Sequence, residues 1–106
     1  MITYEEVLKG RKEQVEKVEK NIDAAIRKET IPEIEDGVVP VRVQNFQSVI
    51  FQDVANLYLS EGSGWALVAF IEDAGSMVVV LVAKGCFDSF RRLFGNCNAK
   101  VFQNNG

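Results

Sequence analysis

The first thirty residues alternate between apolar and charged positions with the period of a helix. Apolar side chains recur every seven residues in two interleaved series, Leu8, Val15 and Ile22, and Tyr4, Val18 and Ala25. This spacing predicts an amphipathic helix whose apolar stripe resembles a coiled-coil seam. Thr3 and Glu6 match a capping box at its start. Because Pro32 cannot continue a helix, we expect the helix to cover residues 3–29 of segment 1–30.

The length of this predicted helix raises the question of what covers it. At 1.5 Å per residue it is roughly 40 Å long, whereas the other ~70 residues should form a globule only about 28 Å across. We therefore expect it to overhang, to bend, or to pack on a second chain. A break at Gly10, which is unfavourable inside a helix, would remove the overhang. Packing of the stripe on the chain's own sheet is the remaining interpretation, and the common one in small domains. The candidate interface residues are Leu8, Val15, Val18 and Ile22.

The next thirty residues are less regular. Residues 31–40 contain both prolines and an Asp-Gly turn signal, which predicts a connector. The alternation of Val39, Val41 and Val43 predicts an edge strand or a strand start, because Pro40 cannot donate to a ladder. Residues 45–60 follow helical spacing, with Asn45 as a candidate N-cap, and we predict a helix there. The alternative is a strand over about 54–60.

Two nearly continuous apolar runs, 65–71 and 77–83, predict an antiparallel hairpin joined by the loop 72–76. Gly75 can supply the positive φ that short hairpin loops require. Because the runs are apolar at successive positions, we expect both faces of the sheet to be covered.

The end of the chain completes the prediction. A short helix is expected over 87–94, ending at Gly95. Val101 and Phe102 could add a strand, and 103–106 read as a frayed tail. The chain is therefore predicted to be a single small α+β domain over 1–106 in the order α-β-α-β-β-α, with an optional last strand, and with its core in 41–102.

Composition narrows the classes of function. Hydrophobic residues make up 47% of the 106 residues, which favours a folded domain over a disordered chain. The net charge is −3, and no basic stripe stands out, which disfavours nucleic-acid binding. No apolar run is long enough to span a bilayer, and the N-terminus does not resemble a signal peptide. We expect a soluble cytoplasmic protein.

Candidate chemistry is sparse. The chain has no histidine, which removes the His-dependent nucleophile systems and His-ligated metals. Cys86 and Cys97 cannot make a four-thiolate zinc site within one chain. They could pack or pair in a disulfide, and Cys86 could be activated at a helix N-terminus, but packing is favoured. We expect no catalytic residues, no metal and no cofactor.

Two further groups of residues are candidate contacts. Phe46, Tyr58 and Trp65 could line a ligand pocket, although aromatic residues at such spacing more often belong to the core. Arg91 and Arg92 could bind an anion, although they also suit the C-terminal end of their helix.

The predicted function follows from these observations. We expect a non-catalytic protein–protein interaction or regulatory module that forms a homo-oligomer through the first helix or the sheet. A further protein partner is an open alternative, and neither nucleic acid nor membrane is expected as a partner. The alternative function is a small-ligand-binding domain with a pocket between helix 45–60 and the 65–83 hairpin.

Overall fold

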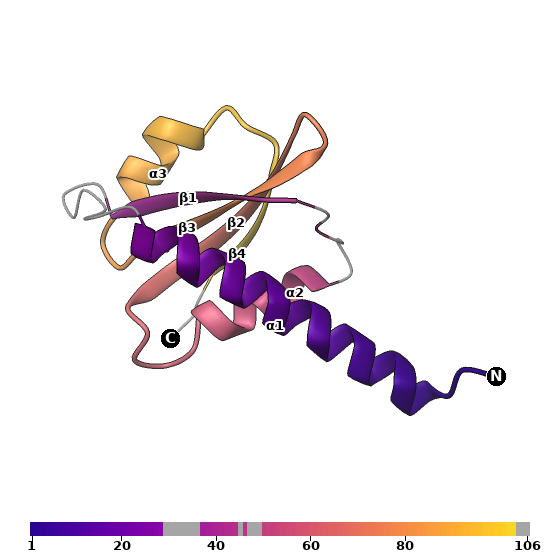
Figure 1. The fold of residues 1–106 in the computed structure, drawn as a ribbon. Helices are drawn as coiled ribbons and strands as arrows, with labels where there is room; N and C mark the ends of the chain where they lie inside the picture. Colours follow the sequence, from indigo (N-terminus) through magenta and orange to yellow (C-terminus); the bar gives the residue numbers. More distant parts are fainter. Residues whose placement is uncertain (29–36, 45, 47–49, 104–106) are drawn as a thin grey trace.

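The computed structural model describes residues 1–28, 37–44, 46 and 50–103. Its architecture is α+β, as the sequence predicts, with a long N-terminal helix, shorter helices and an antiparallel sheet (Figure 1). The elements in chain order are α1 (Tyr4–Lys28), β1 (Val38–Val43), α2 (Phe51–Tyr58), β2 (Trp65–Asp73), β3 (Ser76–Ala83), α3 (Phe87–Phe94) and β4 (Ala99–Gln103).

The first helix begins where the capping residues predict. The backbone N–H of Glu6 donates to Thr3 Oγ1 at 3.2 Å, and the N–H of Val7 donates to the Thr3 carbonyl at 3.2 Å. The first bond satisfies one of the N–H groups that a helix start leaves without partners, and the second is the first backbone bond of the helix itself. The helix runs through Gly10 without interruption, so the alternative of a break there is wrong. Pro32 lies outside the described residues.

The hairpin forms the centre of the sheet, whose strand order is β1-β3-β2-β4 with every neighbouring pair antiparallel. Only Ala74 and Gly75 lie between β2 and β3, with φ of 50° and 84°. Positive φ at both central residues is the requirement of a type I′ turn, which matches the twist of the strands. The loop is therefore shorter than the predicted 72–76, and the strands are longer.

Both faces of the sheet are covered, which confirms the prediction from the apolar runs. Along β2, Val68 and Phe70 belong to a core shared with α1 and α2, whereas Leu67 and Ala69 belong to a second core with α3. Figure 1 shows α1 and α2 on one side of the sheet and α3 on the other. Each face of the strand is apolar because each meets a helix.

The remaining predictions differ in accuracy. Helix 87–94 coincides with α3, and β1 is an edge strand, as Pro40 indicates. The region 45–60 contains a helix over Phe51–Tyr58, so the alternative strand is wrong, and Asn45 lies outside the described residues. Residues 38–40 of the predicted connector belong to β1, and Gln103 of the predicted tail ends β4.

Candidate functional site

The first fourteen residues stand out because none of them is buried. Every residue from Met1 to Gln14, here called the overhang, is exposed, and Val15 is the first buried residue of α1. Figure 1 shows α1 projecting past the sheet toward the N-terminus. The molecule is accordingly 51 Å long but only 33 by 27 Å in the other two directions.

The overhang carries the same apolar stripe as the rest of the helix. Ile22, two helical turns beyond Val15, is 0% exposed, whereas Leu8 is 45% exposed and Tyr4 is 75% exposed. A single exposed leucine is ordinary on a protein surface. Here the exposed residues continue a stripe that is otherwise buried, so the overhang presents an apolar helix face that the described part of the chain covers only in part.

A hollow of about 440 Å³ opens where the overhang meets α2. It is lined by Leu8, Arg11, Lys12 and Val15 from α1 and by Asp53, Asn56 and Leu57 from α2, and is here called the α1–α2 hollow. Arg11 Nε donates to Asp53 Oδ2 at 2.8 Å and so ties the two helices together. Leu57, on the α2 side, is 40% exposed. The hollow is thus an extension of the apolar stripe with charged groups beside it.

A buried tyrosine holds α2 against the later turns of α1. The hydroxyl of Tyr58 donates to Asp23 Oδ1 at 2.9 Å and lies 3.3 Å from the carbonyl oxygen of Glu19. Burial raises the pKa of Tyr58 far above its usual value, and the hydrogen bond to Asp23 and the negative charges of Asp23 and Glu19 raise it further. The hydroxyl therefore stays protonated and remains a donor. This contact, together with the Arg11–Asp53 pair, fixes the geometry of the hollow.

The structure separates the four candidate interface residues into two groups. Val15, Val18 and Ile22 lie in the chain's own core, against the sheet and α2. Leu8 alone remains exposed. One part of the apolar stripe therefore packs within the chain, and the part at Leu8 lies on the surface.

The candidate pocket residues lie in a single core layer. Phe46 packs on Phe51 and Phe70, with ring centroids 5.3 and 5.4 Å apart, and Tyr58 is buried in the same cluster. Trp65 borders a separate hollow of about 370 Å³, formed with the loop after α2 and with Lys84. That hollow is lined by neither Phe46 nor Tyr58, so it does not join the three aromatic residues in one site.

The candidate anion residues lie on the opposite side of the sheet. Arg91 and Arg92 are exposed on α3, and the Arg91 guanidinium lies 4.9 Å from the centroid of the Phe87 ring. This cation–π contact holds Arg91 along its own helix. Beside the helix, Cys86 and Cys97 are free thiols, and Cys86 packs so closely on Gly37 that a Cβ at position 37 would collide with it.

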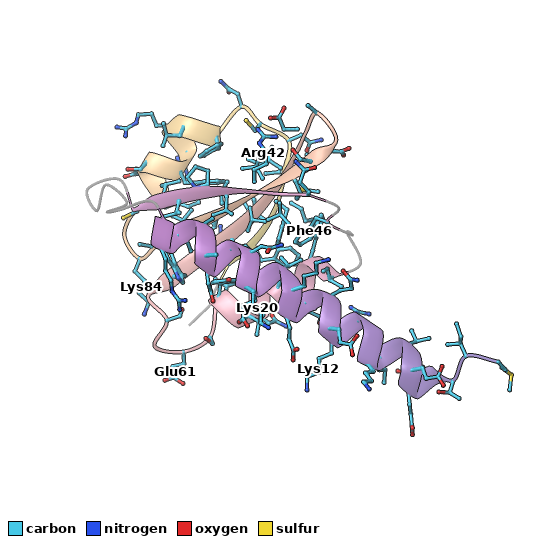
Figure 2. The ribbon with its side chains drawn as sticks, in the orientation of Figure 1. Lys12, Lys20, Arg42, Phe46, Glu61 and Lys84 are labelled. Carbon is cyan, nitrogen blue, oxygen red and sulfur yellow. The ribbon has the colours of Figure 1, made fainter. Side chains whose placement is uncertain are left out.

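A third hollow, of about 610 Å³, lies on the α3 side of the sheet. Pro40, Ile71, Val78 and Phe94 give it apolar walls. At its rim, Arg42 donates to Asp73 Oδ2 at 2.7 Å and also bonds to Ser76; Figure 2 shows Arg42 near the hairpin tip. The sequence pattern did not identify this hollow, because its residues come from four separate segments.

The described residues give no sign of two other kinds of site. Among them, no three Cys, Asp or Glu side chains come close enough together to hold a metal ion. Within the same residues, no helix combines the length and apolar composition needed to cross a bilayer. Comparison with protein-family models, curated proteins and solved structures finds no match to this chain.

Proposed function

We propose that this chain is a non-catalytic assembly module that forms a homo-oligomer through the overhang of α1. One observation carries the proposal, namely that a single apolar stripe is buried in the second half of the helix and exposed in the first. A helix face of this kind lowers its free energy by packing on another apolar surface. Tyr4 and Leu8 are the side chains that would be buried.

The expected strength of the assembly follows from the size of the exposed stripe. Full burial of one such side chain contributes roughly 1.5–3 kcal/mol. The loss of translational and rotational freedom opposes association by an estimated 4–15 kcal/mol. Tyr4 and Leu8 on each of two chains therefore support a weak oligomer that dissociates on dilution, and we expect a dissociation constant of about micromolar or higher.

The first test is the mass in solution, measured by size-exclusion chromatography with light scattering over a range of concentrations. We expect the full chain to be oligomeric and Leu8→Asp to be monomeric, because a carboxylate in the seam would have to be desolvated. Leu93→Asp is the matched control, since Leu93 is exposed to a similar extent, 53%, on α3 and far from the overhang. A full chain that stays monomeric at protein concentrations of hundreds of micromolar would contradict the proposal.

A deletion separates assembly from folding. Removal of residues 1–10 leaves the buried Val15, Val18 and Ile22 in place. We therefore expect this shortened chain to be monomeric and to remain folded. Its circular dichroism should lose only the helical signal of the deleted turns. An oligomer with the same number of subunits after the deletion would place the interface elsewhere, with the sheet edges as the next region to test.

A second candidate function, the binding of a small ligand, is supported by the 610 Å³ hollow on the α3 side. Its apolar walls, with Arg42, Glu72, Asp73 and Asn98 as polar groups beside them, are a combination that ligand pockets use. We expect a ligand to raise the melting temperature of the wild-type chain in a metabolite screen. Val78→Phe, which should fill the hollow, should abolish the shift, whereas a shift that survives this substitution would rule out binding at this position.

A further inference from the structure

The α1–α2 hollow lies beyond the reach of the chain's own Tyr4. It extends along α1 from Leu8 to Val15, and Tyr4 is the next seam residue toward the N-terminus. Because α1 is one continuous helix, Tyr4 stays about 16 Å along the axis from Val15. Tyr4 of the same chain therefore cannot enter the hollow beside Val15, and a Tyr4 seated there would belong to another molecule.

We infer that this molecule is a second copy of the chain, with the two overhangs antiparallel and the partner's Tyr4 seated in the hollow; the inference rests on the proposed function. In an antiparallel pair, a step of four residues forward along one helix matches four residues backward along the other. If the partner's Tyr4 lies beside Val15, the partner's Leu8 therefore lies beside Arg11. Two-fold symmetry repeats both contacts at the other end. The interface is then closed, and each copy completes the other's hollow.

The lining of the hollow suits a tyrosine. Leu8, Val15 and Leu57 offer apolar surface for the ring, and Asp53 and Asn56 offer oxygen atoms that can accept a hydrogen bond from the phenol. Tyrosine is favoured at interfaces where one end of the side chain is apolar and the other polar. The hollow thus provides for both the ring and the hydroxyl of the partner's Tyr4.

Charge favours the antiparallel direction over the parallel one. In this register Glu5 of one overhang comes close to the partner's Lys12, because both occupy the same flanking position of the seven-residue repeat. Figure 2 shows Lys12 on this part of α1, and it lines the hollow. A parallel pair would instead bring the acidic first turns, with Glu5 and Glu6, together. Flanking charges are known to set the direction of paired helices.

Cross-linking of the full chain tests the direction. In a Cys86→Ala, Cys97→Ser background, separate preparations of Glu5→Cys and Lys12→Cys are mixed and treated with a short bismaleimide. We expect a covalent dimer in the mixture and little in Glu5→Cys alone. Lys12→Cys alone should give less dimer than the mixture, because its two thiols are about 7.5 Å apart along the axis, against about 3 Å for the 5–12 pair. Lys9→Cys mixed with Glu5→Cys is the matched control, because position 9 lies on the outer side of the seam.

Exchange of the charges at positions 5 and 12 tests the ion pair between the two copies, and substitution of Tyr4 tests its seating in the hollow. Glu5→Lys should raise the dimer dissociation constant about fivefold, since two symmetry-related pairs are lost, and addition of Lys12→Glu in the same chain should restore it to within about twofold. Tyr4→Ala should raise it about tenfold or more, because a buried aromatic anchor is lost.

The outcomes separate this inference from the proposed function. An oligomer that gives no 5–12 cross-link, or no recovery in the exchanged variant, overturns the antiparallel seating and leaves assembly through α1 standing. A full chain that is monomeric at every concentration overturns both. Binding of α1 to an unrelated protein by a monomeric chain would likewise exclude a second copy as the occupant.

Discussion

The two halves of α1 have one sequence pattern and two different environments. From Val15 onward the apolar stripe packs on the sheet and on α2, whereas from Met1 to Gln14 the same stripe is exposed. Helical periodicity determines which side of a helix is apolar, but the neighbouring elements determine how much of that side is covered. The difference between the halves is therefore a difference in the extent of the globule and not in the helix itself.

The largest expected effect tests the buried half. Ile22→Ala should lower the free energy of unfolding by about 2–5 kcal/mol, because it removes a fully buried side chain and leaves a cavity. Leu8→Ala is the matched substitution in the exposed half, and we expect it to change the free energy of unfolding of the monomer by less than about 0.5 kcal/mol. Urea unfolding of the chain lacking residues 1–10, with and without Ile22→Ala, would measure the first effect. Urea unfolding of the full-length chain at high dilution, with and without Leu8→Ala, would measure the second. Equal effects would contradict the comparison.

The next effect tests the contact that positions α2 on the buried half. Tyr58→Phe keeps the ring but removes the hydroxyl that bonds to Asp23, and we expect a loss of about 1–2 kcal/mol in the free energy of unfolding at neutral pH. Thermal or urea unfolding at pH 7 would measure it. No loss would mean that water replaces the hydroxyl at no cost.

The same residue predicts a dependence on alkaline pH. The folded state holds the pKa of Tyr58 above its usual value, whereas in the unfolded chain it should ionise near pH 10. Above pH 10 the unfolded state therefore binds fewer protons, and stability should fall by up to about 1.4 kcal/mol per pH unit. Below pH 10 this contribution is fully present. Tyr58→Phe should show a shallower fall, and parallel curves would contradict the assignment.

The smallest effect tests the backbone of the exposed half. A Cβ at Gly10 would meet no other atom, and α1 is helical there, so Gly10→Ala should raise the free energy of unfolding by about 0.5–1 kcal/mol. Gly62→Ala is the contrasting control, because φ there is 84° and alanine should destabilise by about 1 kcal/mol. Both are measurable as shifts in the melting temperature. A destabilising Gly10→Ala would indicate that the helix bends at this position.

The sequence predicted best those elements whose signals are local. The bounds of α3 follow from its apolar spacing and Gly95, and the hairpin follows from two apolar runs around Gly75. The start of α2 was placed too early, because Phe46 has the same spacing as the helix but packs on it from outside.

The candidate site could be predicted only in part. Leu8 was identified from the seven-residue repeat, but its neighbours in the hollow, Asp53, Asn56 and Leu57, carry no signal that relates them to α1. Their position depends on the Tyr58–Asp23 and Arg11–Asp53 contacts, each of which joins residues more than thirty positions apart. Periodicity within one segment contains no information about such pairs.

The two-residue turn at Ala74 and Gly75 has a consequence for the order of folding. It makes β2 and β3 neighbours in sequence as well as in the sheet, so their pairing closes a very short loop. The outer strand β1 must instead find β3 across α2 and β2, as Val38 does when it pairs with Val82. Contacts of low sequence separation generally form faster. The centre of the sheet should therefore be the folding nucleus, and β1 should add to an edge that the hairpin has already built.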